Sequence, residues 1–156
     1  MIGQWMKPQV VSVTPTTTAP EAARLVVDKH IGTLPVVDAR GTLLGVVRVQ
    51  DLLDVFMPDF VGLLENIDFV HDFGAMESLE PRSVAEAAGL TMADLMQPPV
   101  AVLESSGLLR ALATMHKHDI RDLPVVDAAG GLVGIASLVD IAAAFLATWV
   151  GEEHAP

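Results

Sequence analysis

Residues 34–39 read L-P-V-V-D-A, and residues 123–128 read L-P-V-V-D-A again. At the same offset of 89, four more identities follow these six consecutive ones. They pair Gly41 with Gly130, Leu43 with Leu132, Gly45 with Gly134, and Asp51 with Asp140. A match of this length at one fixed offset indicates an internal duplication, so we expect the fold to contain the same unit twice.

The repeated stretch predicts a β-hairpin in each copy. Its proline lacks a backbone donor and favours an extended entry, and the two valines that follow favour a strand. Residues 38–41 and 127–130 then have the composition of a tight turn, because Asp bonds its own downstream backbone and Gly tolerates a positive φ. A second apolar run, over 43–47 and 132–136, completes the hairpin.

A short polar set follows each hairpin. In the second copy, Ser137 and Asp140 have the spacing of the N-cap and N3 residues of a helix over 138–149. Two interpretations of this pair stay open. It is a capping box alone, or its hydroxyl and carboxylate also face a ligand. The first copy has Arg48 and Asp51 at these positions.

The other elements recur in the same order. Each copy is expected to have a short helix ending before a proline, a short strand, a longer helix, the hairpin and a final helix. The short helices fall at 2–6 and 92–96, the short strands at 10–13 and 100–103, and the longer helices at 20–30 and around 108–115. We therefore divide the chain into repeat 1 (1–56), an insert (57–90) and repeat 2 (91–156).

Residues 57–90 match neither copy. They are too apolar for a disordered linker. Residues 59–65 predict one helix, and a Ser83–Glu86 capping box predicts another that runs through Ala88. Two compatible interpretations remain: a helical hairpin that packs on the core, and a docking surface for a second subunit or another protein.

Composition excludes several classes of function. The formal net charge is −11, so the chain lacks the basic surface that binds nucleic acid. The sequence has no Cys, which excludes disulfides and thiolate metal sites and suits a cytoplasmic location. Residues 132–150 contain one charge, Asp140, and approach membrane-spanning length. Their counterpart in repeat 1 is polar, so we expect a strand and a buried helix there, with no membrane span and no signal peptide.

Motifs for catalysis and for metal binding are missing. The sequence has no P-loop, no G-x-G-x-x-G and no H-E-x-x-H. His116 and His118 lie two residues apart and do not share a helix face, so an exposed helix end is favoured over a metal site. His71 has no nearby nucleophile to activate. We therefore predict no catalytic residue, no metal site, no required cofactor and no enzymatic activity.

The doubled pattern of P-V-V-D, turn glycine, apolar-Gly-apolar and a final Asp resembles the cystathionine β-synthase (CBS) domain. Two correctly spaced copies resemble the tandem pair called a Bateman module, over about 1–55 and 92–145. The resemblance implies an α+β fold in which two β-α-β-β-α repeats pack as a pseudo-two-fold pair with two clefts between them. It also implies an adenosine-containing ligand: AMP, ADP or ATP, with S-adenosylmethionine or a cyclic dinucleotide as further members of that class.

The resemblance also assigns site residues. Asp140 takes the position that holds the ribose hydroxyls, Ser137 the supporting hydroxyl, and Arg121 the basic position before the proline. Backbone around Leu34 and Leu123, in the proline-containing strands, frames the adenine. Asp122 would repel phosphate at close range.

The first copy keeps Asp51 but has Arg48 where Ser or Thr is usual. Arg48 can pair with a phosphate, fill the cleft, or form a salt bridge with Asp51. The sequence thus predicts one good site, at Asp140, and one altered site. Because the net charge opposes an anionic ligand at long range, local donors must hold it.

The sequence therefore predicts a ligand-sensing regulatory module that works as a homodimer and signals to an unknown effector protein. The alternative is a dimerisation scaffold without a ligand, in which the 57–90 insert recruits a partner. An accessory role in metal transport is a more remote alternative.

Overall fold

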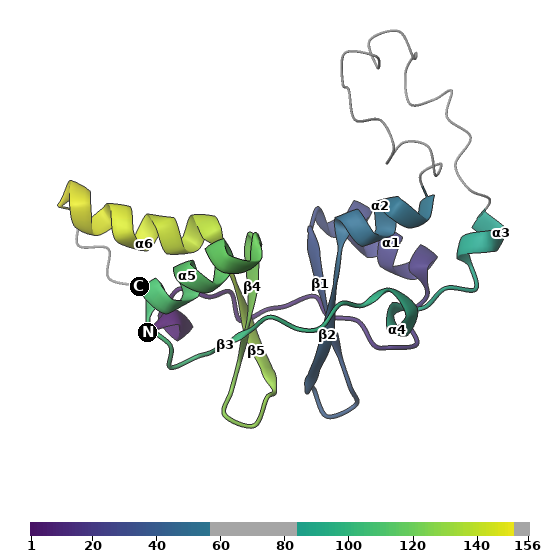
Figure 1. Cartoon of the computed structure of the whole chain (residues 1–156), viewed down its shortest axis with the longest axis horizontal. Helices are drawn as coiled ribbons and strands as arrows, with labels where there is room; N and C mark the ends of the chain where they lie inside the picture. The colour runs from purple at the N-terminus through teal and green to yellow at the C-terminus, as the bar shows by residue number, and fades with distance from the viewer. Residues whose placement is uncertain (57–83, 152–156) are drawn as a thin grey trace, which may run out of the picture.

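Two β-hairpins face each other at the centre of the computed structural model, which describes residues 1–56 and 84–151 (Figure 1). The first hairpin joins β1 (Thr33–Val37) to β2 (Leu43–Arg48), and the second joins β4 (Asp122–Val126) to β5 (Leu132–Ser137). Both are antiparallel and both have a register shift at the second valine of the repeated motif. The predicted hairpins are thus confirmed in both copies.

The hairpin turns are closed by the two repeated aspartates. Asp38 Oδ1 accepts the N–H groups of Arg40 (2.8 Å) and Thr42 (2.9 Å), and Asp127 Oδ1 accepts those of Ala129 and Gly131. The turn glycines have φ values of +82° at Gly41 and +86° at Gly130. Only glycine adopts this conformation without strain, which explains why the turn keeps it in both copies.

Two helices cover each hairpin on its outer side, all at the same end of the molecule (Figure 1). Beside the first hairpin lie α1 (Ala19–Lys29) and α2 (Val49–Phe56), and beside the second lie α5 (Leu108–His118) and α6 (Leu138–Val150). A capping box of Thr18 and Glu21 opens α1. The predicted apolar face of α5 packs into the core of its half through Met115 and its neighbours.

The third strand differs between the halves. In the second half β3 (Val102–Leu103) runs parallel to β4, and the Glu104 N–H extends the pairing to the Val126 carbonyl (2.9 Å). In the first half the strand predicted over 10–13 is reduced to one bridge between Val13 and Val36. The residue equivalent to Glu104 is Pro15, which has no N–H to donate, so the pairing stops there.

Each half borrows a segment from the other repeat. The 3-10 helix η1 (Ile2–Gln4) lies on the second half, where the Ile2 N–H donates to the Ser106 carbonyl (2.7 Å). The matching helix α4 (Met92–Leu95) lies on the first half, where the Met92 N–H donates to the Thr17 carbonyl (2.9 Å). Figure 1 shows both connecting segments crossing between the halves. Accordingly Ile2 is buried in the second apolar core and Met92 in the first.

Equivalent residues of the two hairpins meet at the hairpin turns. The Leu43 N–H donates to the Gly130 carbonyl (3.1 Å), and the Leu132 N–H donates to the Gly41 carbonyl (3.0 Å). Replacing each residue by its equivalent in the other repeat turns one of these bonds into the other. This relation is the one that a two-fold axis produces. The predicted α+β pair with pseudo-two-fold packing is therefore confirmed.

Part of the insert lies within the described residues. A short helix, α3 (Val84–Ala87), precedes Leu90, which packs on the first core. The helix predicted over 59–65 and the capping residue Ser83 lie outside the described residues. The apolar run 132–150 is divided between β5 and α6, as predicted. Over residues 1–56 and 84–151, no helix has the length and apolar character needed to cross a membrane.

Candidate functional site: two clefts at the junction of the repeats

Two cavities open where the halves meet. We name the first the Asp140 cleft; its volume is about 290 Å³. We name the second the Arg48 cleft; its volume is about 490 Å³. The polar residues of the Asp140 cleft are Lys7, Gln9, His30, Thr33, Asp122, Ser137 and Asp140, and those of the Arg48 cleft are Thr33, Arg48, Gln50, Gln97, Asp119, Arg121 and Asp122.

Asp140 performs the capping role and also lines its cleft. Its Oδ2 atom accepts the Ser137 hydroxyl (2.6 Å) and the Ser137 N–H (3.1 Å), while the Ser137 hydroxyl oxygen accepts the Asp140 N–H (3.1 Å). Lys7 Nζ lies 3.8 Å from the same Oδ2 atom. Within the described residues Oδ1 has no partner, and the side chain is 25% exposed. The capping box is therefore confirmed, and the carboxylate that forms it also lines the cleft.

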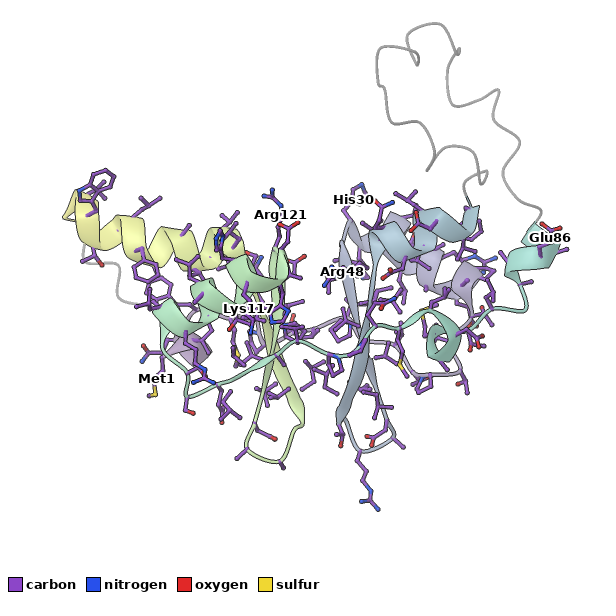
Figure 2. All side chains as sticks on the ribbon, in the orientation of Figure 1. Met1, His30, Arg48, Glu86, Lys117 and Arg121 are labelled. Atoms are coloured by element: carbon purple, nitrogen blue, oxygen red, sulfur yellow. The ribbon has the colours of Figure 1, made fainter. Side chains whose placement is uncertain are left out.

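Arg48 and Arg121 come from opposite halves and line the same cleft (Figure 2). Arg48 ends β2, and Arg121 immediately precedes β4. Neither guanidinium forms an ion pair or a hydrogen bond with any described residue. The salt bridge between Arg48 and Asp51 is thus not formed; instead, the Asp51 carboxylate accepts the backbone N–H of Arg48 (2.7 Å).

The clefts share a wall formed by Gly32 and by one hydrogen-bonded pair, Thr33 and Asp122. The Thr33 hydroxyl donates to Asp122 Oδ2 (3.1 Å), and both residues line both clefts. Thr33 and Asp122 are equivalent positions of the two repeats, so the pseudo-two-fold axis passes between them. A change at this pair reaches both clefts at once.

The structure regroups the residues expected from the sequence. Ser137 and Asp140 lie together, but Arg121 lies in the other cleft with Arg48. Asp51 lines neither cleft, and its carboxylate caps α2. Leu34 and Leu123 are 1% and 0% exposed and belong to the two apolar cores, so their side chains line neither cleft.

Sequence reasoning missed Lys7 and His30 in the Asp140 cleft, and Gln97 and Asp119 in the Arg48 cleft. Lys7 and Gln97 end the segments that cross to the other half. Each exchanges two backbone bonds with a hairpin, Lys7 with Ile135 and Gln97 with Val46. His30 and Asp119 are the left-handed C-caps of α1 and α5, with φ values of +53° and +50°. For Lys7 and Gln97, the signal in the sequence was the Met-polar-Pro triplet that is repeated at 6–8 and 96–98.

The carboxylates with a shifted pKa lie outside the clefts. Hydrogen bonds from Thr18 hold the pKa of Glu21 below its ordinary value, and those from Thr91 do the same for the pKa of Asp94. Backbone N–H groups of Thr42 and Arg40 lower the pKa of Asp38. All three carboxylates cap a helix or close a turn, so these shifts belong to local folding rather than to a reaction.

Metal ligands do not gather in the described parts of the chain. No group of three His, Asp or Glu side chains there has the geometry of a metal site. His116 and His118 lie exposed in the last turn of α5.

Known proteins share this arrangement. The CBS domain family model matches residues 2–58 and 92–147. The chloroplastic CBS domain-containing proteins CBSX2 and CBSX1 of Arabidopsis thaliana are 32% and 34% identical to this chain over 154 residues, which are 93% of its length. The chain spans 63% and 64% of the length of those two relatives. A crystal structure of CBSX2 in complex with AMP superposes with a TM-score of 0.69 at 31% identity, covering 95% of this chain and 97% of that one.

Proposed function

Because the chain belongs to the CBS domain family and contains that domain twice, we propose that it is a regulatory module that senses an adenosine-containing nucleotide. The ligand binds in the Asp140 cleft, at the junction of the two repeats. Binding there acts on the relative position of the halves, provided that the two positions differ in affinity for the ligand. The crystal structure of the related CBSX2 with AMP supports this class of ligand.

The observation that carries the proposal is the free oxygen of Asp140. Its Oδ1 atom has no partner among the described residues and belongs to a partly exposed side chain that lines a cavity. A carboxylate can accept hydrogen bonds from the hydroxyl groups of a ribose. A site for phosphate alone would need donors and not this acceptor. The capping bonds to Ser137 fix this carboxylate in place before the ligand arrives.

Charge and size favour a small nucleotide. Lys7, whose Nζ lies 3.8 Å from Asp140 Oδ2, is a donor beside Asp140 for one phosphate. Asp122 on the far wall opposes additional negative charge. The volume of about 290 Å³ lies just below the range of ligand pockets, which is about 300–1,000 Å³. We therefore place AMP before ADP and ATP, and before S-adenosylmethionine and cyclic dinucleotides.

The test is calorimetric titration of AMP into the purified protein, with Asp140→Asn and Asp51→Asn as a matched pair. Both aspartates accept the N–H of the residue three before them, so both variants lose a similar cap. Only Asp140 lines a cleft. We expect Asp140→Asn to weaken AMP binding by about 10-fold or more, and Asp51→Asn to leave it unchanged. Equal affinities for the wild type and Asp140→Asn would refute the assignment.

A second candidate function, the dimerisation scaffold, is supported by the outer face of α6. Trp149 is 82% exposed, Val150 67% and Leu146 50%, near the C-terminal end of that helix. Exposed apolar residues so close together favour a protein contact. Sedimentation equilibrium would show a dimer that Trp149→Glu dissociates; a monomeric wild type would count against the scaffold. The cytoplasmic location and an effector protein that binds the 57–90 insert remain predictions.

A further inference from the structure

The outer end of the second half exposes a cluster of apolar side chains. Near the end of α6, Trp149 is 82% exposed, Val150 67% and Leu146 50%. Leu109, in the first turn of α5, is 71% exposed. The two helices pack together and run in opposite directions, because α5 ends and α6 begins at the clefts. The end of α6 and the start of α5 therefore lie together at the outer end of this half (Figure 1).

Positive charge continues this surface along α5. Arg110 and Lys117 are exposed and lie seven residues apart, so they occupy one face of the helix. Neither forms an ion pair with a described residue. α5 contains no acidic residue, although the chain has 20 Asp and Glu. We call this surface the α5–α6 patch; it consists of Leu109, Arg110, Lys117, Leu146, Trp149 and Val150.

The helices of the first half have a different surface. α1 and α2 contain four acidic residues, whereas the one acidic residue of α5 and α6, Asp140, lines a cleft. The four are Glu21, Asp28, Asp51 and Asp54. The patch therefore has no counterpart in the other repeat, so the duplication does not account for it. An exposed apolar cluster beside unpaired positive charge is typical of a contact surface, and its partner should be apolar and acidic.

This chain contains a segment with that composition. Residues 57–83, which lie outside the described residues, are 27 in number; six are acidic, one is basic and twelve are apolar. Three of the five Phe residues of the protein fall in this segment. Nearly all of it lies outside the two matches to the CBS domain, at 2–58 and 92–147, so the segment is a feature of this chain rather than of the domain.

The ends of the segment favour a contact between two copies. Phe56 ends α2 and Val84 begins α3, and both helices belong to the first half. The patch lies at the opposite end of the molecule (Figure 1). In a head-to-tail pair, the first half of each copy lies beside the second half of the other. The segment of each copy then meets the patch of the other, and the two equivalent contacts close the pair with two-fold symmetry.

We propose that the α5–α6 patch binds residues 57–83 of a second copy of this chain. Apolar side chains of the segment cover Trp149 and its neighbours, and its carboxylates lie beside Arg110 and Lys117. The inference rests on the self-association of the scaffold function and specifies what covers α6; it does not depend on nucleotide binding. An anionic membrane is the less favoured occupant, because the net charge of −11 opposes it.

The test exchanges charges between full-length variants. One variant combines Arg110→Glu with Lys117→Glu, and the other combines Asp68→Lys with Asp72→Lys. In sedimentation equilibrium each variant alone should self-associate about 10-fold or more weakly than the wild type. An equimolar mixture should recover the affinity, because each segment then meets a patch of opposite charge. Docking within one chain would give no such recovery.

The matched control combines Arg24→Glu with Lys29→Glu, which makes the same change of charge on exposed residues of α1, in the other half. It should leave self-association unchanged. A monomeric wild type, an equal loss in the control, or a mixture that stays monomeric would overturn the proposal. So would binding of the wild type to vesicles of anionic lipid without self-association.

A further comparison separates this inference from the proposed functions. If Trp149→Glu dissociated the dimer while both charge-reversed variants kept it, the scaffold would stand and the segment would be the wrong occupant. AMP affinity, measured on the same proteins, should be the same in the wild type and in both charge-reversed variants. A protein that forms the dimer but binds no AMP would refute the nucleotide-sensing function alone.

Discussion

The Asp140 and Arg48 clefts occupy equivalent places in the two repeats, yet their polar residues differ at almost every position. Lys7 corresponds to Gln97, His30 to Asp119, Gly32 to Arg121, Thr33 to Asp122, and Ser137 to Arg48. The apolar lining is conserved by comparison, with Ile31 matched by Ile120 and Val10 by Val100. The duplication has therefore kept the scaffold of the clefts while their chemistry has diverged.

The buried positions behave in the opposite way. The Leu-Pro-Val-Val run is identical in the two copies, and its first three residues are buried in both hairpins. A packed core tolerates little change in volume, whereas a cavity wall tolerates any side chain that leaves room for a ligand. Four sets of substitutions test this difference between the cores and the cavity walls.

The largest effect is expected in the two cores. Leu34→Ala and Leu123→Ala each remove a fully buried side chain, so each should lower the free energy of unfolding by about 2–5 kcal/mol. Urea denaturation followed by circular dichroism measures this loss. Leu44→Ala, at a site that is 38% exposed, is the control and should change stability much less. If either variant kept near-native stability but lost AMP binding, its leucine would belong to the ligand site and not only to the core.

The next effect concerns the two glycines against which the crossing segments pack. A Cβ atom at Gly45 would lie 2.9 Å from the Gln97 carbonyl oxygen, and one at Gly134 would lie 3.1 Å from the Lys7 carbonyl oxygen and against the Met6 sulfur. Backbone oxygens cannot rotate away, so each Gly→Ala should cost about 1–3 kcal/mol, with Gly45→Ala the larger. Thermal unfolding measures both, beside Gly89→Ala, where the space is open. Unchanged melting temperatures would mean that the segments do not pack as described.

A smaller effect is expected at the wall that both clefts share. Thr33→Val removes the hydroxyl that donates to Asp122 and should cost about 0.5–1.5 kcal/mol of stability. Because the Asp122 carboxylate then faces the Asp140 cleft without the Thr33 hydroxyl, the affinity for AMP should fall. Calorimetric titration of AMP measures this, with Thr114→Val as the control, since Thr114 bonds only within α5. An unchanged AMP affinity in Thr33→Val would contradict this role of the pair.

The smallest effect belongs to the first hairpin turn and depends on pH. The N–H groups of Thr42 and Arg40 hold the pKa of Asp38 below its ordinary value of 3.8. A lowered folded-state pKa means that the stabilisation is present above pH 3.8 and is lost as the pH falls through the folded value. The difference in melting temperature between the wild type and Asp38→Asn should therefore shrink on acidification. A difference in melting temperature that grows towards acid pH would contradict a lowered pKa of Asp38 in the folded protein.

Much of the fold followed from the repeated stretch alone. The proline, the paired valines and the Asp-x-x-Gly turn act over a few residues, so they predicted both hairpins and their turns. The Ser137–Asp140 pair likewise predicted the start of α6, because capping is a local interaction. The reduced first strand was not foreseen, since the missing N–H of Pro15 matters only once its partner strand is known.

The repeated sequence was enough to predict a duplicated α+β unit, with Asp140, Ser137, Arg48 and Arg121 as candidate site residues. Which of these residues share a cleft depends on how the two halves pack. The segments that end in Lys7 and Gln97 cross to the other half. The last residue of each hairpin, Arg48 or Ser137, lines a cleft together with the residues at the start of the other hairpin. Each cleft is therefore built from both repeats. The physical reason is that local interactions fix the elements, whereas a cleft forms only where the packed halves bring distant residues together.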